Sequence, residues 1–155
     1  MTVISLTRIC LAFSASLCCA GSLSAEHHHT DTNKIMTEKL NLTQEWDKVF
    51  PKSDKVTHRK VSFRNRYGIT LAADLYMPLN VNGKLPAIAV SGPFGAVKEQ
   101  SAGLYAQTMA ERGFLTIAFD PSYTGESGGF PRYVASPDIN TEDFCAAVDY
   151  LSTRD

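Results

Sequence analysis

Two short apolar runs on either side of a helical pattern constrain the fold of this chain more than any other feature. Residues 85–90 and 114–119 are almost continuously apolar, which is typical of strands buried on both faces of a sheet. Residues 98–112 show helical spacing, and Gly113 follows as a stop signal. The expected apolar face of this helix comprises Ala102, Tyr105, Ala106, Met109 and Ala110. Strand, helix and strand form a βαβ unit, so the two runs should be parallel neighbours with a right-handed crossover.

A different periodicity precedes this unit. Apolar and polar residues alternate over 56–77, with a turn at 64–68, which predicts an antiparallel hairpin with one buried face. Pro78 ends the hairpin. The stretch 48–66 is rich in Lys and Arg, and we interpret it as a charged outer face of the hairpin, with an anionic partner as the alternative.

A second helix is expected near the end of the chain. Asn140 or Thr141 can cap it, with acidic residues favouring the dipole in its first turn. Its expected apolar stripe comprises Phe144, Ala147, Val148 and Leu151. Cys145 lies within this pattern and is expected to be a buried, inert thiol. The chain ends at Asp155 without a further strand to complete the sheet, so we expect a truncated domain.

The first 25 residues have the order of a secretory signal peptide. Arg8 precedes an uncharged run of apolar and small residues at 9–20, and small residues lead on to Ala25. The run is shorter than the ~20 residues that a membrane-spanning helix needs. Cleavage after Ala25 or Ala20 would give an exported protein, periplasmic or secreted, with no stable membrane anchor. A buried N-terminal helix is the alternative.

Residues 26–55 are a polar lead-in to the domain at 56–155. A short helix near 43–50 is expected to dock Trp46. Three adjacent histidines at 27–29 could bind a metal together with Asp31. Adjacent side chains point in different directions, so we expect a solvated tail there and no metal site.

Charge and cysteine content exclude some classes of protein. The chain has 15 Lys and Arg residues against 16 Asp and Glu residues, and its net charge of −1 provides no basic field for nucleic acid. Of the 4 cysteines, only Cys145 lies outside the signal segment, so no internal disulfide is expected.

Two loops follow the carboxyl ends of the apolar strands, where open α/β sheets bind ligands. The first begins Ser-Gly-Pro-Phe-Gly at 91–95 and lacks the spacing of a P-loop, so a nucleotide-binding domain is a weak alternative. The second, at 120–137, matches Gly-x-Ser-x-Gly around Ser127. Ser127 does not follow its strand directly, and every histidine lies upstream. We therefore interpret it as a hydroxyl that structures the loop rather than a nucleophile.

The order of these elements resembles a known superfamily. A hairpin, a buried strand, a Gly-Pro-Phe-Gly loop, a helix, a second strand and then Asp-Pro-Ser-Tyr-Thr-Gly-Glu-Ser-Gly-Gly from Asp120 look like the N-terminal portion of an α/β hydrolase. The dienelactone-hydrolase-like and X-Pro dipeptidyl-peptidase-like branches are the most similar, and the resemblance covers 56–155. It implies an α/β fold in which an antiparallel hairpin leads into a mostly parallel sheet with flanking helices, truncated before the nucleophile strand.

The resemblance also implies roles for residues. The loop after the first apolar strand would supply an oxyanion-hole N–H. Because Pro93 has none, Phe94 N–H is the expected donor, with Gly95 as the second choice. The pocket-shaping residues would be Asp120, Gly125 and Ser127. The nucleophile, Ser or Cys, and its His base would follow later, and neither is assigned within this chain.

These points predict the N-terminal segment of an exported hydrolase. It would act on a small-molecule ester or related acyl substrate through a covalent acyl-enzyme, without metal or cofactor and without a nucleic-acid partner. The 155-residue chain alone is expected to be inactive. The alternative is a non-catalytic, exported binding module with a hydrolase-like fold.

Overall fold

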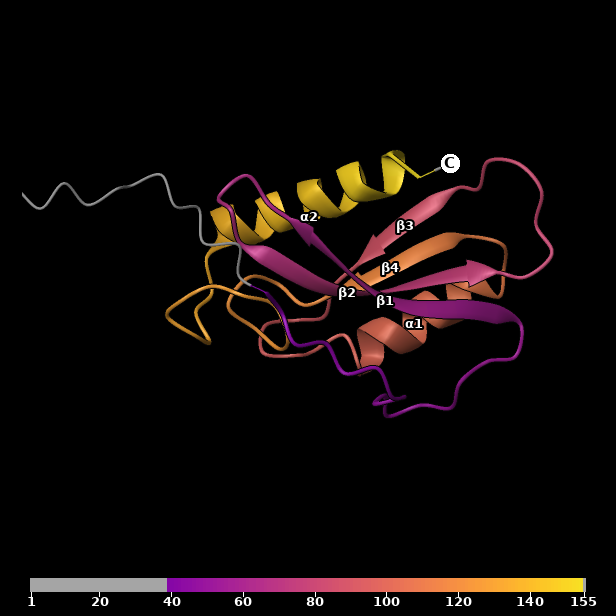
Figure 1. The fold of residues 1–155 in the computed structure, drawn as a ribbon, viewed down its shortest axis with the longest axis horizontal. Coiled ribbons are helices and arrows are strands. Elements are labelled where there is room, and N and C mark those ends of the chain that lie inside the picture. The colour runs from indigo at the N-terminus through magenta and orange to yellow at the C-terminus, as the bar shows by residue number, and fades with distance from the viewer. Residues whose placement is uncertain (1–38, 155) are drawn as a thin grey trace, which may run out of the picture. The chain divides into compact units, whose positions relative to one another are not determined.

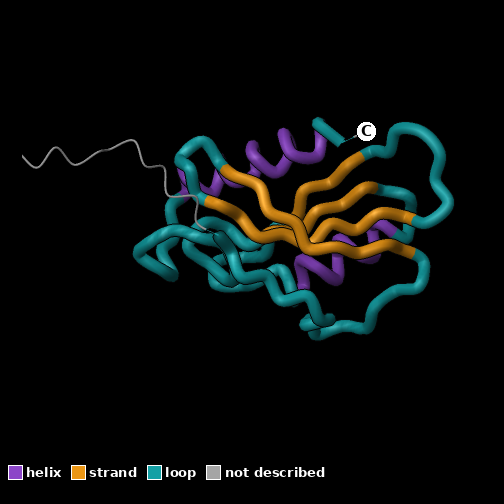
Figure 2. The backbone as a smooth tube through the Cα atoms, viewed as in Figure 1, coloured by secondary structure: helices purple, strands orange, loops and turns teal. Residues whose placement is uncertain are grey.

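The fold is built around a four-stranded sheet with strand order β1-β2-β4-β3 (Figure 1). The computed structural model describes residues 39–154. Its strands are β1 (Val56–Arg64), β2 (Thr70–Pro78), β3 (Ala87–Val90) and β4 (Leu115–Phe119), and its helices are α1 (Ser101–Ala110) and α2 (Pro137–Ser152). The two helices lie on opposite faces of the sheet (Figure 2). The predicted signal peptide and the histidine tail lie outside the described residues.

The predicted βαβ unit is confirmed. Strands β3 and β4 pair in parallel, with Ala87 opposite Leu115 and Val90 opposite Ala118, and α1 lies between them in sequence. The first strand, however, starts at Ala87 instead of residue 85 and is partly exposed. It lies at the edge of the described sheet, so the prediction that it is buried on both faces is wrong.

The hairpin is confirmed, but its burial differs from the prediction. Strands β1 and β2 are antiparallel, with Val56 opposite Pro78. Strand β1 keeps the alternating pattern of an edge strand, whereas almost every residue of β2 is buried. The reason is that β2 also pairs with β4, with Ala73 opposite Phe119, and has a helix over each face.

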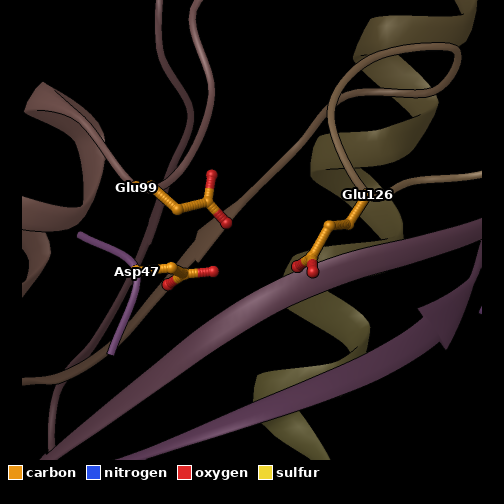
Figure 3. Close-up of side chains that lie close together, drawn as sticks. All are labelled: Asp47, Glu99 and Glu126. Carbon is orange, nitrogen blue, oxygen red and sulfur yellow. The ribbon is translucent and has the colours of Figure 1, made fainter. Parts of the chain in front are cut away.

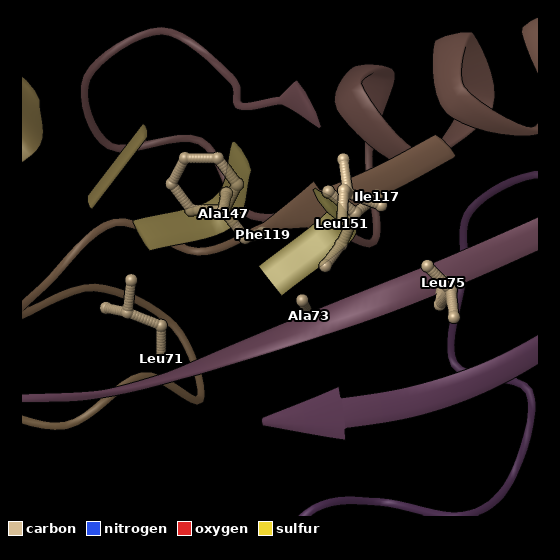
Figure 4. Packing of buried hydrophobic residues seen from close by; sticks show 7 residues of the cluster. All are labelled: Leu71, Ala73, Leu75, Ile117, Phe119, Ala147 and Leu151. Atoms are coloured by element: carbon tan, nitrogen blue, oxygen red, sulfur yellow. The ribbon is translucent and has the colours of Figure 1, made fainter. Parts of the chain in front are cut away.

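Two apolar clusters hold the helices to the sheet. The first lies under α2 (Figure 4) and comprises Leu71, Ala73, Leu75, Ile117, Phe119, Ala147 and Leu151. The second lies under α1 and comprises Val56, Tyr76, Ala102, Ala106, Ala110 and Ala118. Its alanines bring the helix close to the sheet, while Tyr105 is 52% exposed, contrary to the prediction. Full burial of a Leu or Phe side chain contributes about 1.5–3 kcal/mol, so the first cluster carries more of the apolar stabilisation.

Helix α2 begins earlier than the sequence predicts. Ser136 is its N-cap residue and Pro137 occupies the first turn, so the predicted caps Asn140 and Thr141 lie inside the helix. Thr141 Oγ1–H donates to Pro137 O at 2.8 Å. Proline suits a first turn because its missing N–H has no partner there in any case.

The buried stripe of α2 is also rotated from the prediction. Ala147 and Leu151 are buried as expected, but Phe144 is 41% and Val148 54% exposed. The buried positions of α2 instead include Glu142, Asp143 and Ala146. Cys145 is a free and exposed thiol, so the prediction of a buried one is wrong.

The described part of the lead-in docks without forming a helix, in contrast to the helix predicted near 43–50. Trp46 Nε1–H donates to Phe50 O at 2.8 Å. The indole ring also meets the rings of Phe50 and His58 edge-on, with centroids 5.7 and 5.2 Å apart. Within residues 39–154, no helix has both the length and the apolar character to cross a membrane.

Candidate functional site

The loops after β3 and β4 start at the same edge of the sheet, because the two strands are parallel neighbours. The chain thus brings residues 91–100 and residues 120–136 together at the carboxyl ends of the strands. This is the edge at which open α/β sheets bind ligands.

The first loop presents backbone donors. Ala96 N–H donates to Pro93 O at 2.9 Å, which closes a turn with Phe94 and Gly95 at its centre. Gly95 has a φ of 83°, a conformation that disfavours other residues. Among the described residues, no acceptor binds the N–H of Phe94 or of Gly95. The Phe94 side chain is 72% exposed, so the turn is accessible.

The second loop is organised around Asp120. This carboxylate is fully buried and accepts hydrogen bonds from Lys98 N–H at 2.8 Å, from Lys98 Nζ at 2.8 Å and from Glu126 N–H at 2.9 Å. A Cβ at Gly125 would lie 2.2 Å from Asp120 Oδ2, so only glycine fits beside the carboxylate. Asp120 thereby joins the loop after β4 to the loop after β3.

The hydroxyl group of Ser127 both donates and accepts a hydrogen bond. Its Oγ–H donates to Asp120 O at 2.7 Å, and its oxygen accepts from Ala72 N–H at 2.8 Å. The side chain is 2% exposed. His58, the single histidine within 39–154, pairs instead with Asp74 at 2.7 Å. These contacts agree with a structural hydroxyl and leave Ser127 without the free oxygen and base that a nucleophile needs.

Backbone contacts pin the rest of the second loop. The Arg132 guanidinium donates to Gly125 O at 2.6 Å and also to Ser127 O. Tyr133 N–H donates to Tyr123 O at 2.9 Å, and both tyrosines have a positive φ, 61° and 72°. Such backbone conformations persist only where neighbouring contacts enforce them.

A buried carboxylate on α2 anchors the start of this loop. Asp143 accepts hydrogen bonds from Ser122 N–H, Ser122 Oγ–H and Asn65 Nδ2–H, each at 2.8 Å. The sequence predicted Asp143 as an acidic residue of the first turn that favours the helix dipole. The structure instead uses it to connect the turn of the hairpin, the loop and the helix.

Sequence reasoning missed Lys98, whose side chain is fully buried. Besides Asp120, its ammonium group binds Glu126 at 2.7 Å. Burial would lower the pKa of Lys98, but the charge of Asp120 and the hydrogen bonds to the surrounding carboxylates raise it above its usual value. A lysine next to an apolar strand and loop was the available signal, but two of its three partners, Asp120 and Glu126, lie more than twenty residues away in sequence.

Two lysines of the basic stretch 48–66 join the same network, which corrects the prediction of a charged outer face for these two only. The other basic residues of the stretch are exposed as predicted: Lys52, Lys55, Arg59, Arg64 and Arg66. Lys60 is 3% exposed and binds Asp47 at 2.6 Å and Glu126 at 2.7 Å. Lys48 is fully buried and binds Asp47 at 2.7 Å and Asp74 at 3.1 Å. These lysines are buried because carboxylates from other segments neutralise them.

Three carboxylates of the network point toward one another (Figure 3). Oxygens of Asp47, Glu99 and Glu126 lie within 4.8 Å of one another, a spacing compatible with a metal ion. The ammonium groups of Lys60 and Lys98 already bind these oxygens. Burial alone would raise the pKa of Asp47 and of Glu126, but hydrogen bonds from lysines lower each to about 2. We therefore interpret the cluster as an ion-pair network.

An apolar groove of about 760 Å³ lies at the other end of β3, near Leu85 and Ala87. Its walls include Leu75, Met77, Leu115, Val148 and Leu151, with Arg59, Lys84 and Arg154 among the lining residues. None of the lining residues belongs to either candidate loop, so the groove is not part of the candidate site.

Comparison with known proteins gives a family. The model of the family X-Pro dipeptidyl-peptidase (S15 family) matches residues 67–154. Protein PA2218 of Pseudomonas aeruginosa is 78% identical over 115 residues, which are 74% of this chain and 31% of that protein. The thiohydrolase aneE of Aspergillus aculeatus is 33% identical over 99 residues, which are 64% of this chain and 30% of that protein. The chain spans about a third of the length of these relatives.

Solved structures of similar proteins support the same family. The crystal structure of PA2218 has a TM-score of 0.73 and 77% identity, over 75% of this chain and 36% of that one. Est1E of Butyrivibrio proteoclasticus, solved with ferulic acid, has a TM-score of 0.53 and 28% identity, over 61% of this chain and 38% of that one. These matches confirm the predicted α/β-hydrolase resemblance and fold class. The chain belongs to the X-Pro dipeptidyl-peptidase (S15) family of the α/β hydrolases.

Proposed function

We propose that this chain is the N-terminal segment of an exported hydrolase and that it supplies the oxyanion hole. The observation that carries the proposal is the pair of backbone N–H groups at Phe94 and Gly95, which lack an acceptor within residues 39–154. They follow β3 at the carboxyl edge of the sheet. The names of similar proteins, a thiohydrolase and an esterase bound to ferulic acid, support an ester or related acyl substrate.

The chemistry proposed for the site is acyl transfer. When a nucleophile attacks an acyl carbonyl, negative charge develops on the carbonyl oxygen, and preorganised N–H donors stabilise that charge. Phe94 N–H is the first donor and Gly95 N–H the second. Asp120, Gly125 and Ser127 shape the pocket wall by fixing the neighbouring loop. The nucleophile and its histidine base come from residues that follow position 155 in the complete protein.

The proposal places the protein outside the cytoplasm. Residues 1–25 have the order of a signal peptide, so export to the periplasm or the exterior is expected. Mass spectrometry of the protein from an expressing cell would test this point. An N-terminus at Glu26 or Gly21 would support it, and an intact Met1 would contradict it.

A proline substitution tests the oxyanion donor. In the coding sequence extended past residue 155, Phe94→Pro removes the N–H. Proline is favoured at this second position of a turn whose third residue is a glycine with positive φ. Loss of one such donor lowers kcat by about 10²–10³-fold toward p-nitrophenyl esters. Phe94→Ala keeps the N–H and is the matched control. Equal kcat for the proline and alanine variants would rule out the donor.

The 155-residue chain alone is expected to have no hydrolase activity. Turnover of p-nitrophenyl acetate by this chain that disappears in Ser127→Ala would contradict this expectation. A complete protein that folds but hydrolyses no ester or thioester would favour a binding module instead.

A further inference from the structure

Lys98 lies in the loop after β3, residues 91–100, which also carries the proposed oxyanion donors and is called the donor loop below. It hydrogen-bonds to Asp120 in the loop after β4. We infer that Lys98 is a positioning residue, which holds Phe94 N–H and Gly95 N–H in place by binding Asp120. The inference rests on the proposed function for its catalytic meaning. The positional effect itself can be measured without any activity.

Two hydrogen bonds to Asp120 hold the main chain of Lys98 in place and orient its side chain. The backbone N–H of Lys98 donates to Asp120 Oδ1, and its Nζ donates to Asp120 Oδ2, each at 2.8 Å. A single carboxylate therefore binds the main chain and the end of the side chain of the same residue. Charge-assisted hydrogen bonds of this kind are about twice as strong as neutral ones.

The donor loop has few other restraints. Within the described part of the chain, the hydrogen bonds of residues 92–97 either stay inside the loop or reach Gln100. Ala96 binds Pro93, and Val97 accepts from Gln100 N–H at 3.1 Å. Lys98 is thus the first residue after the turn that binds the loop following β4.

Burial makes this contact hard to replace with water. The side chains of Lys98 and Asp120 are both fully buried, and Glu126 N–H also binds Asp120. Removal of the ammonium group leaves a buried carboxylate that keeps two backbone N–H donors but loses its ion-pair partner. A shift of Asp120 would move the Lys98 main chain, and Phe94 is only four residues earlier in the chain.

Lys60 provides a matched control in the same network. Its side chain is 3% exposed and binds Asp47 at 2.6 Å and Glu126 at 2.7 Å. It also lies 3.7 Å from Glu99, but among the described residues it forms no hydrogen bond or ion pair with Asp120 or with residues 92–97. Lys60→Met and Lys98→Met therefore each remove one ammonium group from the same network, but only the second removes a contact to Asp120, which also binds the Lys98 main chain.

Nuclear magnetic resonance of the 155-residue chain tests the positional effect. In Lys98→Met, the amide signals of Phe94 and Gly95 should shift or broaden, and their hydrogen exchange should change. In Lys60→Met, these two signals should stay as in the unsubstituted chain although stability falls. Unchanged signals in Lys98→Met, or equal changes in both variants, would overturn the inference. Should Lys98→Met fail to fold, Lys98→Met with Asp120→Asn removes both charges and takes its place.

Kinetics of the complete protein test the catalytic consequence. Displacement of an oxyanion donor by about 1 Å costs about 10²-fold, so kcat should fall by that factor in Lys98→Met with KM nearly unchanged. Lys60→Met should retain most of the kcat. If the unsubstituted complete protein hydrolyses no ester, the proposed function fails, whereas the amide signals still decide whether Lys98 positions the loop.

Discussion

The two candidate loops start at the same edge of the sheet but use their polar groups in opposite ways. In the loop after β4, Asp120 and Ser127 are buried and fully hydrogen-bonded. In the loop after β3, the N–H groups of Phe94 and Gly95 have no acceptor within 39–154. The Gly-x-Ser-x-Gly motif therefore lies in a loop whose polar groups hold the structure together, and the simpler Gly-Pro-Phe-Gly turn is the one that leaves backbone N–H groups without an acceptor among the described residues.

The largest loss of unfolding free energy is expected when the Asp120 carboxylate, which organises the loop after β4, is removed. Asp120→Ala leaves Lys98 and two backbone N–H groups without their carboxylate. Loss of one partner from a buried ion pair costs about 3–5 kcal/mol of unfolding free energy. Urea unfolding followed by the fluorescence of Trp46 measures this loss. Asp138→Ala, at an exposed position of the first turn of α2, is the control and should cost less than about 1 kcal/mol.

The next largest effect compares alanine substitutions at two glycines with positive φ, one in each loop. A Cβ at Gly125 would collide with Asp120, whereas a Cβ at Gly95 meets nothing within 4 Å. Gly95→Ala should therefore cost only the conformational term of about 1–2 kcal/mol. Gly125→Ala adds a collision with a buried carboxylate and should cost a further 1–3 kcal/mol or so. Equal losses of unfolding free energy in the two variants would show that the Asp120 side chain moves aside freely and is not held rigidly in the loop.

The sequence predicts much of this contrast but not its cause. Continuous apolar runs and helical spacing identify β3, α1 and β4, because burial and periodicity are local properties of the chain. The position of Ser127, away from its strand, also suffices to doubt it as a nucleophile. Lys98 is missed because two of its partners, Asp120 and Glu126, are 22 and 28 residues away in sequence.

The incorrect predictions of which residues are buried also result from contacts between segments that are distant in sequence. Alternation along residues 70–78 predicts one buried face, yet β2 is covered on both because it lies between β1 and β4. In the same way, Phe144 and Cys145 fit an apolar stripe, but the contacts of Asp143 with Ser122 and Asn65 turn another side of α2 inward. Pairing order and long-range hydrogen bonds decide these cases, and a local pattern does not contain them.

Acid should weaken the ion-pair network that contains Asp47 and Glu126. The pKa values of Asp47 and Glu126 are lowered to about 2 in the folded chain, from 3.8 and 4.5. Their stabilisation is therefore present above about pH 5 and is lost as the pH falls toward 2. For Glu126 the loss is on the order of 1–3 kcal/mol. Urea unfolding between pH 7 and pH 2 measures it, and Glu126→Gln should give a shallower decline. An equal decline in both proteins would exclude Glu126 as a contributor.

The smallest effects compare one side chain from each loop. Ser127→Ala leaves Ala72 N–H and Asp120 O without the hydroxyl group that joins them, which costs about 1–3 kcal/mol. Phe94 is 72% exposed, so Phe94→Ala should change the unfolding free energy by less than about 0.5 kcal/mol. A larger loss of stability in Phe94→Ala than in Ser127→Ala would mean that the turn after β3 is a packed element of the fold, and the contrast between the two loops would then disappear.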